Sequence, residues 1–299
     1  MTEQTFPQGI HVPLVTPFTA GGLVAREALE GLAHTLLDAG AAGLVALGTT
    51  AEAGALDAEE KRVVVETCVR VCQERDVPLT VGAGSNDTRS SEAALAALAR
   101  WPAVTAALVT VPAFTRPSEE GVIAHFARLT AVSPVPLIVY HIPYRTSLPL
   151  SVATLRTLGS MPDIVGIKYA GGGISQETVE LLGDLPPGLS MLAGDDLFVS
   201  PLLAMGAAGG ILASAHLATR RFAELADAWR TGDTRRARSL GHTLARLSAV
   251  LFREPNPAVV KAVLHTRGLI PTPDVRLPLL PAGRATVAES LQRLGEVEG

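Results

Sequence analysis

Eight short apolar segments recur along the chain, and most of them alternate with longer amphipathic segments. The short segments are rich in β-branched residues and are bounded by turn residues, which is typical of buried strands. The predicted strands are Ile10–Val15, Gly43–Leu47, Pro78–Gly82, Ala106–Val111, Pro136–Tyr140, Ile164–Lys168, Ser190–Ala193 and Gly209–Ala213. Such units pair their strands in parallel, and eight of them favour a closed (β/α)8 barrel over an open doubly wound sheet.

The segments between the strands repeat apolar residues at three- and four-residue spacing, which predicts helices. The helices of the barrel are expected at about Arg26–Ala39, Ala58–Glu74, an alanine-rich stretch ending near Trp101, Ser118–Val132, a stretch from about Ser151, Ser175–Gly183 and Ala218–Trp229. After Gly232 the pattern is helical only, at about Asp233–Phe252, Pro257–Thr266 and Arg284–Leu294. We therefore predict a barrel over residues 1–232 that carries the active site, and a helical extension over residues 233–299 packed on it.

Composition excludes several classes of protein. A chain of 299 residues that is 47% hydrophobic can bury a large core as one main domain. Its 25 basic and 29 acidic residues include no basic stretch suited to nucleic acid. No apolar run is long enough to cross a membrane, and Met1–Thr5 lacks the features of an export signal. We expect a soluble, cytoplasmic protein that binds neither nucleic acid nor a membrane.

Metal and nucleotide chemistry find no support in the sequence. Cys68 and Cys72 lie four residues apart in a predicted helix, without further ligand residues at suitable spacing. We expect both to be reduced core residues. Because glycine-rich nucleotide motifs are missing as well, we predict no metal and no cofactor.

A lysine ends the sixth predicted strand, and a glycine-rich loop follows it. The period of two places Ile164, Gly166 and Lys168 on one face, so the glycine leaves room beside the lysine. Burial there lowers the pKa of the ammonium group, and a neutral amine can attack a carbonyl. The alternative is a lysine that marks a strand end and extends to water.

Other polar residues follow the ends of neighbouring strands. They are Thr49 and Thr50 after the second strand, Tyr140 and Arg145 at the fifth, and Asp195 and Asp196 after the seventh. The active sites of barrels lie at these strand ends, so we expect these residues to converge with Lys168. A desolvated lysine beside a phenol suits Schiff-base catalysis, and an arginine can hold a carboxylate. Amide groups of the glycine-threonine loop could hold another carboxylate.

With these residues in place, the chain resembles the dihydrodipicolinate synthase and N-acetylneuraminate lyase superfamily, the pyruvate-dependent class I aldolases. The matching stretches are Val12–Phe18, Gly48–Glu52, Tyr140–Thr146, Gly166–Lys168, Gly194–Asp196 and Glu254–Pro257. The resemblance implies that Lys168 forms an imine with pyruvate and that Tyr140 carries protons. It also implies that Thr49 and Thr50 bind the pyruvate carboxylate, that Leu212 contributes to substrate binding, and that the protein is a homotetramer built as a dimer of dimers. For Asp195 and Asp196 it implies a mainly structural role.

Some positions follow the synthases and others depart from them. Arg145 resembles the arginine by which the synthases hold the carboxylate of aspartate semialdehyde. Phe114 stands where they carry a tyrosine that completes a proton relay across a subunit interface, and it has no hydroxyl. Ala113 and Ser90 replace residues of their lysine-feedback site, so no feedback by lysine is expected.

Three further departures change the expected surroundings of the second substrate: His141 replaces asparagine, Tyr169 replaces glutamate and Ala51 replaces glycine. We therefore expect a Schiff-base lyase or aldolase that joins or separates pyruvate and an aldehyde. The synthase itself is the first alternative. A dehydratase that works through the same imine and a non-catalytic 2-oxo acid binding protein also stay open.

Overall fold

The computed structural model describes residues 8–299. Met1–Thr5, where no export signal is expected, lies outside the described residues. The strands form a closed barrel in chain order. They are β1 (Gly9–Pro13), β2 (Gly43–Ala46), β3 (Leu79–Gly82), β4 (Val104–Thr110), β5 (Leu137–His141), β6 (Ile164–Tyr169), β7 (Ser190–Ala193) and β8 (Gly209–Ile211). Strand β1 pairs in parallel with β2, and β4 to β8 pair in parallel in succession, which confirms the predicted (β/α)8 fold.

The helices lie close to the predicted ranges. They are α1 (Arg26–Asp38), α2 (Ala58–Arg75), α3 (Thr88–Ala97), α4 (Glu119–Val132), α5 (Pro143–Thr146), α6 (Val152–Gly159), α7 (Gln176–Gly183), α8 (Val199–Ala204), α9 (Ala215–Thr231), α10 (Thr234–Leu251), α11 (Ala258–Thr266) and α12 (Arg284–Glu298). The short helices α5 and α8 are additions to the prediction. Helix α5 begins with Pro143, whose fixed φ suits a first helical position.

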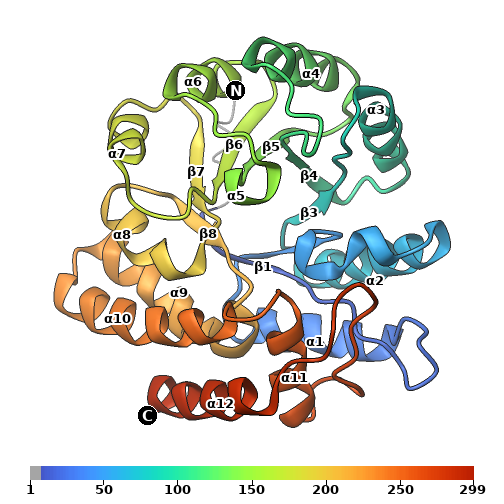
Figure 1. The fold of residues 1–299 in the computed structure, drawn as a ribbon, viewed down its shortest axis with the longest axis vertical. Coiled ribbons are helices and arrows are strands. Elements are labelled where there is room, and N and C mark those ends of the chain that lie inside the picture. Colours follow the sequence, from blue (N-terminus) through green and yellow to red (C-terminus); the bar gives the residue numbers. More distant parts are fainter. Residues whose placement is uncertain (1–7) are drawn as a thin grey trace. The chain divides into compact units, whose positions relative to one another are not determined.

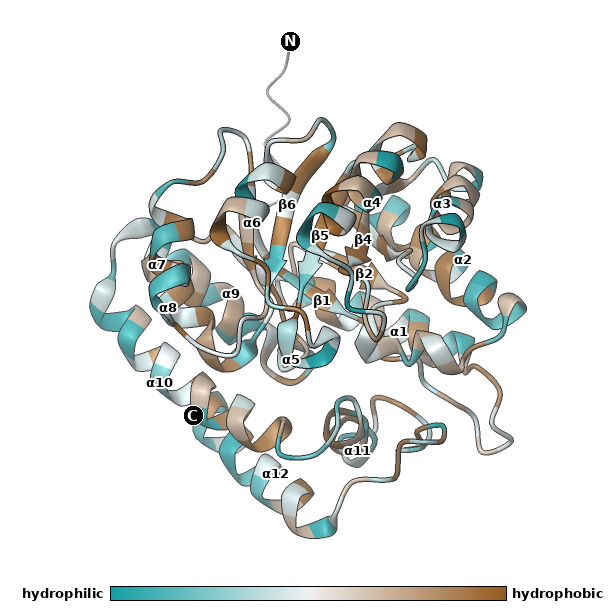
Figure 2. Ribbon diagram, turned by 45° about the horizontal axis from the view of Figure 1, so that its top comes forward, coloured by the Kyte–Doolittle hydropathy of each residue, from teal (hydrophilic) through white to brown (hydrophobic). Residues whose placement is uncertain are grey.

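One compact unit spans residues 80–210 and carries β4 to β7. Helices α3, α4, α6 and α7 lie on the outside of these strands (Figure 1). In Figure 2, β4 and β6 are largely hydrophobic, whereas the helices carry both hydrophobic and hydrophilic residues. This is the pattern expected of parallel barrel strands whose outer face is covered by amphipathic helices and whose inner face lines the barrel core.

The second compact unit combines residues 9–79 with residues 211–299. Its C-terminal helices pack on the last helix of the barrel, since α10, α11 and α12 all contact α9. Helices α10 and α12 also lie side by side (Figure 1). The boundary between barrel and extension at residue 232 stays a prediction, because the two compact units reflect packing and do not mark a domain boundary.

Helix α9 starts earlier than predicted and is broken near its beginning. It begins at Ala215, and Ala218 has non-helical dihedral angles, with φ −138° and ψ 41°. The predicted start at Ala218 therefore coincides with the break, because the apolar periodicity becomes regular only beyond it.

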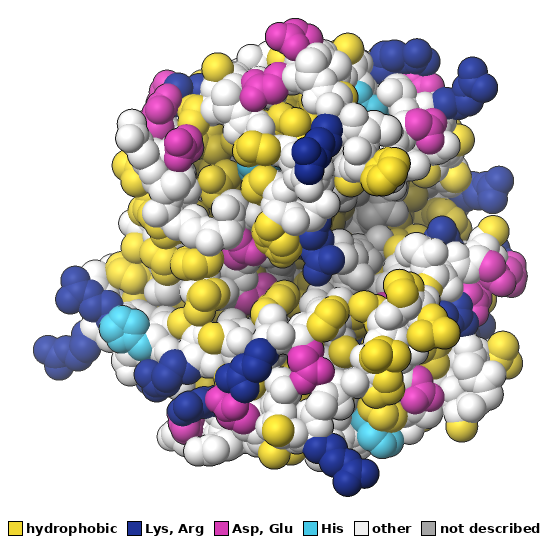
Figure 3. Space-filling view, in the orientation of Figure 1, with side chains coloured by type: hydrophobic (Ala, Val, Ile, Leu, Met, Phe, Trp, Pro, Cys, Tyr) yellow, Lys and Arg dark blue, Asp and Glu magenta, His cyan; other side chains and the backbone are white. Residues whose placement is uncertain are grey.

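Two observations concern the surface. No helix in residues 8–299 is long and apolar enough to span a membrane. On the face shown in Figure 3, basic and acidic side chains are interspersed, and no field of one sign covers it. An extended basic surface for nucleic acid is therefore missing from this face.

Candidate active site

Tyr140 and Lys168 are direct neighbours on adjacent strands. The register of β5 and β6 pairs them, and the Lys168 Nζ lies 4.1 Å from the centroid of the Tyr140 ring. Their relative exposures are 5% and 6%. The amine therefore sits against an aromatic face with little access to water, as predicted for a desolvated lysine.

The next pair along the same strands shows which way these side chains point. His141 pairs with Tyr169, and their rings are 5.6 Å apart between centroids. The Tyr169 hydroxyl lies 3.1 Å from Thr178 Oγ1 in α7, which belongs to the outer layer of helices. Because successive strand residues face opposite sides, Tyr140 and Lys168 face the interior of the barrel.

Burial sets the protonation of both groups. It lowers the pKa of Lys168 to about 8, although the nearby charges of Asp196 and Asp195 raise this pKa. The Arg145 charge lowers it further. Burial also raises the pKa of the Tyr140 phenol well above its usual value. At neutral pH the tyrosine therefore keeps its proton, and a fraction of the lysine is a neutral amine.

The loops that follow β6 and β7 are tied together next to Lys168. The Gly172 N–H donates to Asp195 Oδ2 at 2.7 Å. A Cβ on Gly194 would lie only 3.0 Å from Lys168 Cγ, so glycine permits the close approach of the two strand ends. The Asp195 carboxylate thus links the loop after β7 to the loop after β6. Burial raises the pKa of its carboxyl group.

Arg145 and Phe114 are both exposed residues of the same unit, each in the segment that follows a strand. Arg145 lies in α5, directly after β5, with its Cζ 5.7 Å from the centroid of the Tyr144 ring. Phe114 follows β4, is 92% exposed and has a left-handed φ of 65°. Phenylalanine brings no hydrogen-bonding group to this position.

Thr49 and Thr50 belong to the other compact unit, where they open a short 3-10 turn after β2. Thr49 is exposed and Thr50 is buried. The Asn256 Nδ2 donates to Thr50 Oγ1 at 2.9 Å, so the Thr50 hydroxyl proton is available for another acceptor. The turn can thus offer hydroxyl and amide donors to an anion.

Leu212 follows β8 in the same unit. Its side chain is fully buried, and its N–H donates to the His11 carbonyl at 3.1 Å, which joins the last strand to the first. Its predicted part in substrate binding stays a prediction.

Sequence reasoning did not find two further residues near the Thr49–Ala51 turn. Asn256 lies in one of the family-like motifs, but no role was predicted for it. Lys261 stands alone in the apolar run Val259–Leu264 of α11 and is fully buried. A single charge within an apolar helical run signals a buried ion pair, but its partner cannot be identified from the sequence.

Among residues 8–299, no group of three or more His, Cys, Asp or Glu side chains is placed to hold a metal ion. Cys68 and Cys72 are buried free thiols, and burial raises the pKa of both.

The chain is similar to known proteins over nearly its full length. The model of the dihydrodipicolinate synthetase family matches residues 6–294. A 4-hydroxy-tetrahydrodipicolinate synthase of Sorangium cellulosum is 37% identical over 294 residues, which cover 96% of this chain and 95% of the relative. The 4-hydroxy-tetrahydrodipicolinate synthase 2 of Clostridium acetobutylicum is 35% identical over 92% of this chain and 94% of the relative.

Solved structures agree with these matches. The dihydrodipicolinate synthase of Acinetobacter baumannii, solved in complex with pyruvate, superimposes with a TM-score of 0.92 at 33% identity, covering 97% of this chain and 99% of that one. The enzyme of Cyanidioschyzon merolae, solved with lysine bound, superimposes with a TM-score of 0.92 at 26% identity, covering 98% of this chain and 99% of that one. The chain therefore belongs to the dihydrodipicolinate synthetase family and is a lyase of the pyruvate-dependent class I aldolase type.

Proposed function

We propose that Lys168 attacks the keto carbon of pyruvate and forms an imine through which the enzyme joins or separates pyruvate and an aldehyde. The observation that carries this proposal is the buried amine against the Tyr140 ring, with a pKa lowered to about 8. The neutral amine adds to the ketone, and the resulting carbinolamine loses water. The cationic imine nitrogen then draws electrons from the methyl carbon, which can lose a proton and attack an aldehyde.

Tyr140 is the proposed proton carrier. Its raised pKa keeps the phenol protonated at neutral pH, so it can donate a proton to the carbinolamine hydroxyl as water leaves. The resulting phenolate can take up the proton that the methyl carbon loses, and the phenol restored in this way can protonate the acceptor oxygen when the new bond forms. Its place beside Lys168 on the neighbouring strand supports this role.

Thr49 and Thr50 are the proposed holders of the pyruvate carboxylate. Asn256 occupies Thr50 Oγ1 as a donor and leaves the hydroxyl proton free, which suits an anionic ligand. We also propose that Leu212 contributes to this site, as the family resemblance implies.

The second substrate decides between two candidates. Arg145, exposed in α5 directly after the strand that carries Tyr140, supports a carboxylate-bearing acceptor such as aspartate semialdehyde. The relatives named as 4-hydroxy-tetrahydrodipicolinate synthases favour that candidate too. Phe114, His141 and Tyr169 depart from the synthases, so we favour a different aldehyde, released from or added to a 2-keto acid aldol. A 2-keto-3-deoxy sugar acid or a hydroxylated 2-oxo diacid fits this description.

We further propose a cytoplasmic homotetramer, built as a dimer of dimers as the family resemblance implies. Sedimentation equilibrium of the full chain tests the assembly directly. A monomer at micromolar concentration would contradict it.

The test of the proposed reaction is turnover by the wild type and two lysine variants. Pyruvate formation from a panel of 2-keto acid aldols, and pyruvate consumption with a panel of aldehydes that includes aspartate semialdehyde, are measured in parallel. Lys168→Ala is expected to abolish every activity that the wild type shows, whereas Lys61→Ala is expected to keep it. Normal turnover by folded Lys168→Ala would overturn the mechanism, and water loss without pyruvate formation would identify a dehydratase.

A further inference from the structure

A buried ion pair involves Glu52, the residue that follows the Thr49–Ala51 turn. Lys261 of α11 donates from Nζ to Glu52 Oε1 at 2.8 Å. The Lys261 side chain is 0% exposed and that of Glu52 is 2% exposed. Glu52 is the residue immediately after the turn, so the pair connects the C-terminal extension to the segment that carries Thr49 and Thr50.

Both oxygens of the Glu52 carboxylate are occupied. Oε1 accepts from Lys261, and Oε2 accepts from the Arg276 N–H at 2.7 Å. The Lys261 Nζ and the Arg276 Cζ also lie 4.0 and 4.4 Å from the centroid of the Phe18 ring. Because every charged group has a partner, the buried cluster is compatible with a stable fold.

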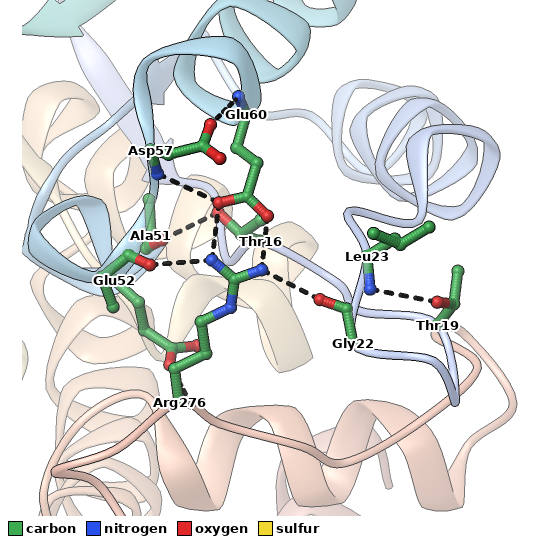
Figure 4. A network of polar contacts seen from close by, with 10 residues as sticks. Thr16, Thr19, Gly22, Leu23, Ala51, Glu52, Asp57, Glu60 and Arg276 are labelled. Carbon is green, nitrogen blue, oxygen red and sulfur yellow. Dashed lines mark hydrogen bonds and ion pairs between the residues drawn. The ribbon is translucent and has the colours of Figure 1, made fainter.

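Arg276 ties the cluster to further segments, and Figure 4 shows its contacts with Gly22 and Glu60. Its guanidinium donates to the Ala55 carbonyl at 2.7 Å, to the Gly22 carbonyl at 2.9 Å and to the Glu60 carboxylate. Glu60 forms a capping box with Asp57 at the start of α2. The side chain of Glu52 is therefore held by contacts with two segments, one of which is itself hydrogen-bonded to several others.

The anchoring acts on the backbone of the turn. Glu52 has a left-handed φ of 55°, which is unfavourable for a residue other than glycine. Its N–H donates to the Thr49 carbonyl at 3.2 Å, and the Thr16 hydroxyl donates to the Ala51 carbonyl at 2.7 Å. The side-chain contacts of Glu52 thus hold a strained residue that closes the Thr49–Ala51 turn.

We propose that Glu52 and Lys261 are positioning residues that hold the Thr49–Ala51 turn in the geometry that binds the pyruvate carboxylate. This inference rests on the proposed function of Thr49 and Thr50. Neither residue of the pair takes part in proton transfer or in imine formation. Loss of the pair should therefore weaken pyruvate binding and leave the chemistry at Lys168 largely intact.

The experiment measures borohydride trapping of pyruvate on Lys168 as a function of pyruvate concentration, in the full-length protein. For Lys261→Met, the pyruvate concentration that gives half the limiting trapping rate is expected to rise about tenfold or more, while the limiting rate changes less than about threefold. Lys61→Met is the matched control, because the chain has only three lysines and Lys61 lies on α2, outside the cluster. It should leave both quantities unchanged.

A double variant separates positioning from stability. Glu52→Gln with Lys261→Met leaves no unpaired buried charge, so its unfolding midpoint should recover relative to Lys261→Met alone. Its half-saturating pyruvate concentration should stay raised, because the contact from Nζ to Oε1 is still missing. A purely structural pair would instead recover both together. If Lys261→Met fails to fold, the double variant carries the test.

Two negative results have different meanings. An adduct on Lys168 in the wild type, together with an unchanged half-saturating concentration in the folded variants, overturns the positioning role alone. No adduct in the folded wild type overturns the proposed function and the positioning role with it.

Discussion

Lys168 and Lys261 are both buried, but their surroundings favour different chemical forms of the side chain. The Lys168 amine lies against the Tyr140 ring, and burial lowers its pKa to about 8. Burial also lowers the pKa of Lys261, but Glu52 opposes this through its charge and a hydrogen bond. The first lysine is therefore available as a nucleophile, and the second remains the cation of an ion pair.

The lowered pKa of Lys168 predicts the pH dependence of pyruvate capture. As pH rises through about 8, the neutral fraction of the amine grows, so kcat/KM for pyruvate should rise about tenfold per pH unit below 8 and level off above it. In Asp195→Asn the rising limb should move to lower pH, because a carboxylate that raises the Lys168 pKa is removed. A profile that keeps rising to pH 10 would show an ordinary, solvated lysine.

The same pKa predicts that Lys168 reduces stability. The pKa of Lys168 in the folded protein, about 8, lies below its value in the unfolded chain. The loss of folding stability caused by Lys168 is therefore fully present below pH 8 and disappears as the pH rises toward the unfolded pKa. Lys168→Met should therefore be more stable than the wild type at pH 7 by about 1–3 kcal/mol, with the difference shrinking above pH 8. Denaturant unfolding at several pH values measures this, with Lys61→Met as the control. A less stable Lys168→Met at pH 7 would contradict the assignment.

At the scale of elements, the proposed active site depends on how closely the ends of β6 and β7 approach each other. Gly194 lies where any side chain would meet Lys168 Cγ at 3.0 Å and Ala170 Cβ at 3.1 Å. The bond from Gly172 to Asp195 holds the two following loops in the same relation. The position of the amine is therefore set by backbone packing as well as by its own strand.

Gly194→Ala should displace Lys168 and reduce kcat/KM for pyruvate by about ten- to hundredfold, because small misplacement of a reacting group is costly. Its loss of stability should be about 1–3 kcal/mol, as for other overpacked sites. Gly173→Ala is the matched control, since its added Cβ would meet nothing within 4 Å. Both quantities come from steady-state kinetics and denaturant unfolding. Full activity in Gly194→Ala would show that the close approach does not position the amine.

At the scale of the whole molecule, the family resemblance raises the question of regulation by lysine. The structure of the Cyanidioschyzon merolae relative was solved with lysine bound. In this chain Ala113 and Ser90 stand at the positions expected to form a lysine site. A methyl group and a hydroxyl supply neither an aromatic surface nor a carboxylate for an ammonium group.

We therefore predict that L-lysine at millimolar concentration leaves the reaction rate unchanged. The measurement is the rate at half-saturating pyruvate with and without lysine, at constant ionic strength. Saturable inhibition by L-lysine that D-lysine does not reproduce would contradict the prediction.

The order of elements and the face of Lys168 could be predicted because they depend on local periodicity. Tertiary pairings could not be. Lys261 is 209 residues from Glu52, and Asn256 is 206 residues from Thr50, so local sequence carries no signal for either pair. Sequence patterns also missed the break at Ala218 and the left-handed φ of Phe114. At both positions tertiary packing overrides the backbone conformation that the residue prefers on its own.

Imine formation at Lys168 is tested most directly by borohydride reduction of the protein in the presence of pyruvate, followed by peptide mass spectrometry. Since the chain has only Lys61, Lys168 and Lys261, each lysine can be assigned separately. We expect a pyruvate adduct on Lys168 and none on the other two. A folded protein that gives no adduct, or an adduct on a different lysine, would contradict it.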